Sequence, residues 1–272
     1  MAATALLSHP AEGVGLIVID NPPRNFGTLE LATKIIESLQ AAAEARCRVV
    51  ILASDRPGYF IAHWSLQYII DTQRAAGPPK TSYRVPQRAV FDLIETSPMI
   101  VIAANNGQAW GGGAELSWGC DLRIAAESAS YGQPEVALGI IPGAGGTTRL
   151  ARLIGATKCM EMILDARPIS AREALALGAI NKVVPDDRLR TEAIDWACHI
   201  AQWPAWSLAA CKRSLIEGRD VALEVARRNE SQLFQSVARR EDSIRIMAAA
   251  QARYDAGADS FEALGIPRPQ AK

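Results

Sequence analysis

Apolar residues recur at two different spacings in the first hundred positions of the chain. Continuous apolar runs at 14–20, 49–53 and 99–104 have the length and the β-branched content of buried strands. Between them, residues 29–45 and 82–95 place apolar side chains three and four positions apart, which predicts amphipathic helices. Strands that alternate with helices favour parallel pairing, so we expect an α/β layer.

Proline and glycine interrupt this alternation at two places. The sequence Asp-Arg-Pro-Gly at 55–58 follows the second apolar run and predicts a type I turn with Pro57 at its second position. Residues 75–79 form a second break, before the helix expected at 82–95.

Strand signals stop near Pro185, and helical periodicity continues beyond it. We predict four consecutive helices, at 189–201, 205–217, 221–239 and 242–256. Their apolar faces are broader than a lone tail could bury against itself, so we expect them to pack on the main domain or on another subunit. This pattern predicts an α/β core over 1–200 that holds the active site and a C-terminal helical region over 201–272 that serves oligomerisation.

Composition and charge exclude several classes of protein. The chain has 272 residues, of which 49% are hydrophobic and 21% charged, as in ordinary globular proteins. Its 29 Lys and Arg residues balance 29 Asp and Glu residues, which argues against nucleic-acid binding through a basic field. The longest apolar runs are far shorter than the roughly 20 residues that cross a bilayer, so we expect no membrane span.

Cysteine and histidine positions point to a cytoplasmic protein without a metal site. The five cysteines are scattered and form no Cys-x-x-Cys pair, which suits reduced thiols that are mostly buried. The three histidines share no spacing that could gather a metal. The first ten residues have no basic stretch before their apolar residues, so no secretory signal is expected and the cytoplasm is the predicted location.

Glycine gathers in the middle of the chain, within two specific motifs. The first is Asn-Gly-x-x-x-Gly-Gly-Gly-x-Glu-Leu at 106–116, followed by Cys120-Asp121; the second combines Gly-Gln-Pro-Glu at 132–135 with Ile-Pro-Gly-Ala-Gly-Gly-Thr at 141–147. In this order they resemble the crotonase superfamily, the enoyl-CoA hydratase/isomerase proteins. The resemblance extends over nearly the whole chain and implies an α/β fold with a repeated ββα spiral core and a C-terminal α-helical region.

The first motif also makes chemical sense without the resemblance. The strand at 99–104 leads through a glycine-rich turn into a helix that begins near Gly112, which leaves backbone N–H groups and the positive end of a helix dipole at the turn. The resemblance implies that the N–H groups of Gly112 and Trp64 form an oxyanion hole for a thioester carbonyl. One such donor is typically worth about 2.7 to 4 kcal/mol in the transition state.

Two acids match the catalytic glutamates of the superfamily. Glu115 falls in the first turn of the expected helix, and Glu135 falls in the Gly-Gln-Pro-Glu loop. The resemblance implies syn addition of water to the C2=C3 bond of a trans-2-enoyl-CoA, with Glu115 taking a proton from water and Glu135 giving one to C2. Two carboxyls around one water do not both ionise easily, and we expect the pKa of the acid assigned to C2 to be raised.

The loop before the helix departs from the superfamily pattern. His63, Trp64 and Ser65 stand where Gly, Ala and Asp are usual. A left-handed backbone at His63 would cost roughly 1 to 2 kcal/mol more than at glycine, whereas Ser65 can cap a helix that begins near Leu66. His63 is either a catalytic base or a side chain that fills space, and the second is favoured.

The resemblance also implies contacts to the substrate. The acyl-CoA would touch Ala62, His63, Trp110, Gly111, Pro142 and Gly143, and its CoA phosphates would meet Arg24 and Arg253. If the rings of Trp64 and Trp110 face the acyl group, short or flat acyl groups are preferred; otherwise both rings pack in the core. Coenzyme A enters as part of the substrate, and no other cofactor is expected.

Enoyl-CoA hydration in fatty-acid or related acid breakdown is therefore the favoured function. Another crotonase reaction (isomerisation, decarboxylation or carbon–carbon cleavage) and a weakly catalytic acyl-CoA-binding protein are the alternatives. The resemblance implies a homo-oligomer, either a trimer or a dimer of trimers, and the RNA binding of some relatives finds no basic tract here.

Overall fold

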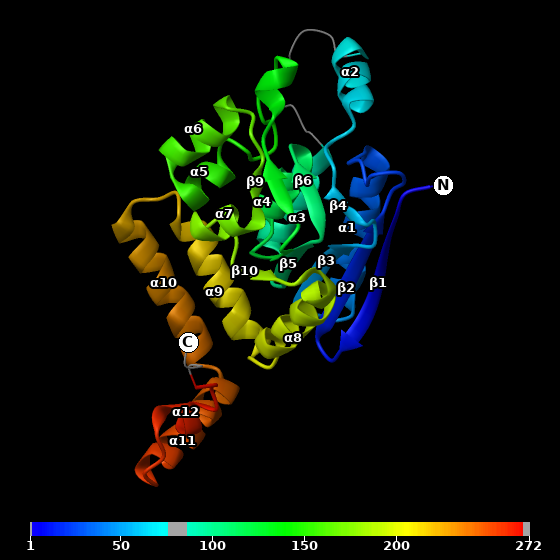
Figure 1. The fold of residues 1–272 in the computed structure, drawn as a ribbon. Helices are drawn as coiled ribbons and strands as arrows, with labels where there is room; N and C mark the ends of the chain where they lie inside the picture. The colour runs from blue at the N-terminus through cyan, green and yellow to red at the C-terminus, as the bar shows by residue number, and fades with distance from the viewer. Residues whose placement is uncertain (1, 76–85, 269–272) are drawn as a thin grey trace. The chain divides into compact units, whose positions relative to one another are not determined.

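The computed structural model describes residues 2–75 and 86–268 (Figure 1). The chain divides into two compact units, Met1–Ala209 and Ala210–Lys272, and the division falls inside helix α9 (Ala205–Gly218). Among the described residues, no helix is both long enough and apolar enough to cross a membrane.

The first unit is built on a six-stranded sheet of order β1-β2-β3-β5-β7-β10. All neighbours pair in parallel except β1 and β2, which form an antiparallel hairpin at one edge. The expected parallel layer is confirmed, whereas β1 is not among the predicted strands. The strands are β1 (Thr4–Ala11), β2 (Val14–Asp20), β3 (Val49–Ser54), β5 (Ile100–Asn105), β7 (Leu122–Ala126) and β10 (Lys182–Val184).

Helices cover both faces of this sheet (Figure 1). Helix α1 (Leu29–Glu44) packs on β1 and β2 and against α3 (Pro86–Thr96), while α8 (Leu189–Ala201) packs on β2, β3, β5 and β7. Every residue of β3 and β5 is buried as a result, which explains their continuous apolar sequence. Residues 82–85 of the helix predicted at 82–95 lie outside the described residues.

A second, four-stranded sheet of order β4-β6-β8-β9 carries the glycine-rich motifs. Its strands are β4 (Gly58–Ile61), β6 (Gly107–Trp110), β8 (Ser130–Gly132) and β9 (Ile169–Ser170). Residues 107–110, predicted as part of a turn, therefore form a strand. Helix α4 (Gly112–Gly119) follows β6 directly, and all eight of its residues are buried.

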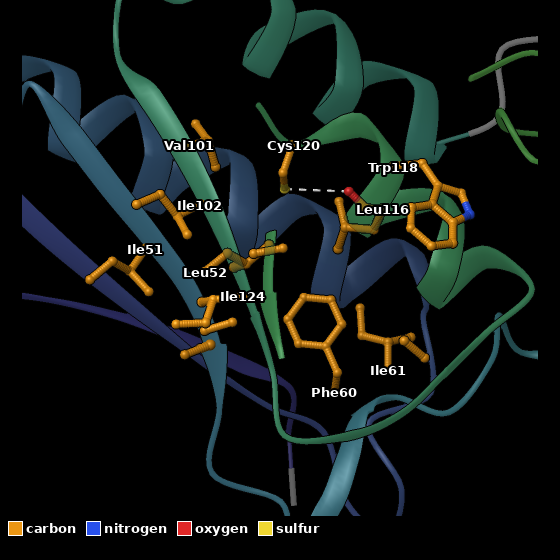
Figure 2. Packing of buried hydrophobic residues seen from close by; sticks show 14 of the residues in the cluster. Ile51, Leu52, Phe60, Ile61, Val101, Ile102, Leu116, Trp118, Cys120 and Ile124 are labelled. Atoms are coloured by element: carbon orange, nitrogen blue, oxygen red, sulfur yellow. Dashed lines mark hydrogen bonds between the residues drawn. The ribbon is translucent and has the colours of Figure 1, made fainter. Parts of the chain in front are cut away.

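Part of the core lies where this second sheet and α4 meet the large sheet (Figure 2). Phe60 and Ile61 of β4 lie beside Leu116 and Trp118 of α4, in a cluster that also takes in side chains of β3, β5 and β7. Three cysteines (Cys47, Cys120 and Cys159) are buried as predicted; Cys198 is partly buried and Cys211 is exposed.

The turn before β4 corrects one prediction. The N–H of Tyr59 bonds to the carbonyl of Arg56 at 3.1 Å, so Pro57 and Gly58 are the central residues. Gly58 has φ +75°, which belongs to a type II turn and not to the predicted type I.

The remaining helices of the first unit connect the two sheets or follow them. They are α2 (Leu66–Ala75), the 3-10 helix η1 (Glu135–Leu138), α5 (Arg149–Ile154), α6 (Ala156–Leu164), α7 (Ala171–Ala176) and the 3-10 helix η2 (Asp186–Arg188). In the second unit, α9 is followed by α10 (Leu223–Ala238), α11 (Glu241–Asp255) and α12 (Ser260–Leu264). Neither α10 nor α11 has a buried residue.

Candidate active site

The start of α4 presents free backbone donors. Gly111 takes φ +50°, a left-handed value that suits glycine, and turns the chain from β6 into the helix. Its carbonyl accepts from the N–H of Glu115 at 2.9 Å, which leaves the N–H of Gly112 at the open end of the helix. In the part of the chain that the structure describes, this N–H donates to no acceptor.

The loop at 62–65 presents a second free donor. Trp64 forms an isolated parallel bridge with Gly27, in which Gly27 bonds to the carbonyl of His63 (2.9 Å) and to the N–H of Ser65 (2.8 Å). The N–H of Trp64 itself has no acceptor within residues 2–75 and 86–268. Ser65 caps α2 as predicted, because its Oγ accepts from the N–H of Tyr68 at 3.3 Å.

The backbone of this loop is not strained. The described non-glycine residues with positive φ are Asn25, Arg46 and Ala166, so His63 avoids the left-handed conformation. Its Nδ1 lies 2.7 Å from the carbonyl oxygen of Trp64, and its ring packs on Phe26 with the ring centroids 4.7 Å apart. The free-energy cost of a left-handed backbone at His63 therefore does not apply.

The two residues that carry these free donors, Trp64 and Gly112, line one cavity of about 540 Å³. The cavity brings together the predicted residues His63, Trp64, Trp110, Gly111, Gly112, Glu115, Glu135 and Gly143. Further lining residues, none of them predicted, come from α2 and from η1 and the loop after it: Leu66, Tyr68, Ile69, Gln73, Ala137, Leu138, Ile140 and Ile141. For the residues of α2, the sequence signal is the helical spacing of its apolar side chains, which predicts a helix with one apolar face but not that this face lines a cavity.

Glu115 is held by a loop from the second motif. It is only 3% exposed, and its Oε1 accepts from the N–H groups of Ala144 (2.7 Å) and Gly146 (3.0 Å). Burial raises the pKa of the Glu115 carboxyl, and these N–H groups together with the charge of Arg149 oppose the rise. Arg149 is itself paired with Glu95 of α3 at 3.0 Å.

Glu135 begins the 3-10 helix η1 and is 8% exposed. Burial raises the pKa of its carboxyl to about 7, with the nearby charge of Glu115 as the second cause. The fully buried Gln133 is assigned with its amide nitrogen 3.1 and 3.2 Å from the two oxygens of Glu135, and its amide oxygen accepts from Trp118 Nε1 at 3.1 Å. Gln133 is not among the predicted site residues, although the Gly-Gln-Pro-Glu motif contains it.

The two tryptophan rings lie in different surroundings. Trp64 is 7% exposed, belongs to the apolar core and packs its ring on Gly27. Trp110 is partly buried, donates from Nε1 to Ser130 Oγ at 3.0 Å and lies beside Gly132. The interpretation that the ring packs in the core therefore suits Trp64 better than Trp110.

Of the predicted contact residues in the first unit, three do not line the cavity. Ala62 and Pro142 are buried outside its wall. Arg24 is exposed, with its guanidinium 6.0 Å from the ring centroid of Tyr59, and Arg253 belongs to α11 of the second unit. Within the described ranges, no three His, Cys, Asp or Glu side chains gather closely enough to hold a metal ion.

Comparisons with known proteins extend over most of the chain. Residues 9–254 match the family model described as enoyl-CoA hydratase/isomerase. A glyoxysomal fatty acid beta-oxidation multifunctional protein of Brassica napus is 36% identical over 73% of this chain, which corresponds to 27% of that protein. The chain thus spans about a quarter of the length of such multifunctional relatives.

Two further proteins match along almost their whole length. The 2,3-dehydroadipyl-CoA hydratase of Escherichia coli is 32% identical over 87% of this chain and 91% of its own. The crystal structure of an enoyl-CoA hydratase from Bacillus anthracis superposes with a TM-score of 0.82 at 32% identity, covering 93% of this chain and 96% of that one.

Proposed function

Because the chain belongs to the enoyl-CoA hydratase/isomerase family, the crotonase superfamily, we propose that it is an enoyl-CoA hydratase that adds water to the C2=C3 bond of a trans-2-enoyl-CoA. One observation carries the proposal: two acids in different environments, Glu115 and Glu135, line the same cavity as Trp64 and Gly112, the residues with free backbone N–H groups. Hydration needs these parts, namely a proton acceptor, a proton donor and an anion site for the thioester oxygen.

The thioester carbonyl would accept hydrogen bonds from the N–H groups of Trp64 and Gly112. Both N–H groups lack a competing acceptor among the described residues, so they are available to a ligand. Their hydrogen bonds draw electron density from C3 through the conjugated carbonyl and stabilise the negative charge that develops on oxygen. C3 thereby becomes open to attack by water.

The two carboxyls would divide the proton transfers. Burial raises the pKa of Glu115, and the N–H groups of Ala144 and Gly146 oppose this rise by favouring its ionised form. In that form Glu115 would accept a proton from water as the water oxygen bonds to C3. Glu135 has a pKa of about 7, so about half of the molecules keep this proton at neutral pH, and it would donate that proton to C2. The proton gained by Glu115 then returns through solvent, which restores both groups.

The wall of the cavity supports an acyl substrate. Leu66, Ile69, Leu138 and Ile141 offer apolar surface near the two acids, where each buried methylene contributes about 0.8 kcal/mol. The regular backbone at His63 also removes the reason to favour a weakly catalytic binding protein, because the donor at Trp64 is present and free.

Pure protein mixed with a panel of trans-2-enoyl-CoA thioesters tests the proposal. We expect loss of the conjugated-enoyl absorbance and a 3-hydroxyacyl-CoA product. An unchanged absorbance with every thioester, under conditions in which a known hydratase turns them over, would contradict hydration; a rearranged or cleaved product would favour another crotonase reaction.

The assembly and location are part of the same proposal. We propose a trimer or a dimer of trimers, supported by the lack of buried residues in α10 and α11. Light scattering should give a mass of at least three chains, and a clean monomer would contradict it.

The proposed compartment is the cytoplasm, supported by five cysteines without a disulfide.

A further inference from the structure

The segment at 21–27 lies along the loop at 60–65 and is fixed to it. Asn25 is fully buried with φ +51°, and its Nδ2 donates to Ser54 Oγ (2.6 Å) and to the carbonyl of Phe60 (3.1 Å). The N–H of Ala62 bonds to the carbonyl of Arg24 at 3.2 Å. These bonds place Gly27 beside Trp64.

Gly27 holds the two peptide groups that flank Trp64. The carbonyl of His63 and the N–H of Trp64 belong to one trans peptide, so they point in opposite directions. Because that carbonyl accepts from the N–H of Gly27 at 2.9 Å, the N–H of Trp64 is directed away from Gly27. The next peptide is fixed by the 2.8 Å bond from the N–H of Ser65 to the carbonyl of Gly27.

The indole of Trp64 occupies the space that a side chain at position 27 would take. A Cβ added to Gly27 would lie 2.1 Å from Cε3, 2.6 Å from Cζ3 and 2.8 Å from Cδ2 of that ring. These distances are far below van der Waals contact, and the ring is buried and cannot swing freely into solvent. The φ of Gly27 is not in the left-handed region, so its backbone would accept alanine and the obstacle is the indole.

We propose that Gly27 is a positioning residue for the oxyanion hole. Its two backbone hydrogen bonds direct the N–H of Trp64 toward the thioester oxygen, and its missing side chain leaves room for the indole beside that bridge. Gly27 touches no reacting atom; it acts through Trp64. The inference rests on the proposed function, in which the N–H of Trp64 binds the thioester carbonyl.

Three variants separate the effect of the clash from the effect of the ring. Gly27→Ala should lower kcat for hydration by about 10- to 100-fold with KM within about threefold, since complete loss of one oxyanion donor costs about 10² to 10³ in kcat. Trp64→Ala keeps its N–H and should stay within about tenfold of wild type. The double variant Gly27→Ala/Trp64→Ala has no clash and should return to within about threefold of Trp64→Ala.

The carbonyl stretch of a bound acyl-CoA reports the donor directly. A saturated acyl-CoA labelled with ¹³C at the thioester carbonyl cannot be hydrated, so difference infrared spectra measure polarisation even if the wild type hydrates no enoyl-CoA. Binding to wild type should lower the frequency, Gly27→Ala should move it back toward the value in water, and the double variant should lower it again.

The outcomes separate this inference from the proposed function. An unchanged kcat in Gly27→Ala, a fall in kcat without a change of carbonyl frequency, or a double variant no better than Gly27→Ala would each overturn the role of Gly27. Leu39→Ala, which opens a cavity in α1, is the stability-matched control and should alter neither kcat nor the carbonyl frequency. An inactive wild type that still shifts the carbonyl would overturn hydration alone.

Discussion

The two sides of the proposed oxyanion hole are built by different means. On one side, the N–H of Gly112 is free because it begins α4, and the glycine turn that exposes it lies next to it in the sequence. On the other side, the N–H of Trp64 is free because Gly27, 37 positions earlier, bonds to the peptide groups around it. Local hydrogen bonding fixes the first donor, whereas tertiary pairing fixes the second.

This difference indicates which donor is more sensitive to substitutions elsewhere in the chain. A helix start keeps its N–H direction as long as the helix forms. A donor held across two segments depends on every contact that keeps the segments in register, including the buried amide of Asn25. Substitutions far from the cavity should therefore disturb the Trp64 side more than the Gly112 side.

Removing either carboxylic acid should have a larger effect than removing either donor. We expect Glu115→Gln and Glu135→Gln each to lower kcat by about 10² to 10⁴, because each removes a proton transfer. Binding of the CoA ester should stay within about tenfold, since the amide is close in shape. Steady-state kinetics and calorimetric titration would measure the two effects; retained hydration in either variant would remove that residue from the mechanism.

Deleting the N–H of Gly112 tests the locally built donor. Proline is tolerated at the first position of a helix, so Gly112→Pro removes the N–H without breaking a hydrogen bond inside α4; circular dichroism would confirm that the variant is folded. We expect kcat to fall by about 10² to 10³. Gly112→Ala keeps the N–H and serves as the matched control. Equal kcat values for the two variants would mean that Gly112 gives no hydrogen bond to the transition state.

The pKa of Glu135 couples stability to pH. Between pH 4.5 and about 7, the unfolded chain releases this proton while the folded chain keeps it, so the free energy of unfolding should fall as pH rises. Well above pH 7 the penalty is complete, on the order of 3 kcal/mol, and kcat should fall as the acid ionises.

Urea unfolding at a series of pH values would measure this effect. Glu135→Gln cannot ionise, so its unfolding free energy should show a smaller decline between pH 4.5 and 7 than that of the wild type. Parallel curves for the two proteins would mean that the carboxyl titrates at its ordinary pKa.

The smallest effect is expected at His63. Its Nδ1 supports the Trp64 carbonyl, but the two Gly27 bonds hold the same peptides, so His63→Ala should lower kcat by less than about tenfold. His63→Asn offers a shorter side chain with a donor and should come closer to wild type. A loss as large as that of the glutamate variants would instead favour His63 as a catalytic base.

Most elements that depend on local periodicity could be predicted. The strand at 14–20 and the helix at 189–201 agree with β2 and α8 because a continuous apolar run or a helical repeat is visible within each segment. The start of α4 and the acid on its first turn follow from the adjacent glycines in the same way.

Contacts between segments that are distant in the sequence could not be predicted. Strands β4, β6, β8 and β9 have between two and four residues each, too few to show a period, and they exist because their partners satisfy their hydrogen bonds. The bridge from Gly27 to Trp64 and the orientation of Gln133 toward Glu135 are likewise contacts between distant segments. The raised pKa of Glu135 could be expected, because it needs only two acids and burial.

The close packing of Trp64 on Gly27 sets an order for evolutionary change. A side chain at position 27 collides with the indole, whereas a small residue at position 64 collides with nothing at Gly27. A lineage that exchanges both residues must therefore change position 64 first. Among descendants and relatives, we expect tryptophan at 64 to occur only with glycine at 27, while smaller residues at 64 accompany many residues at 27.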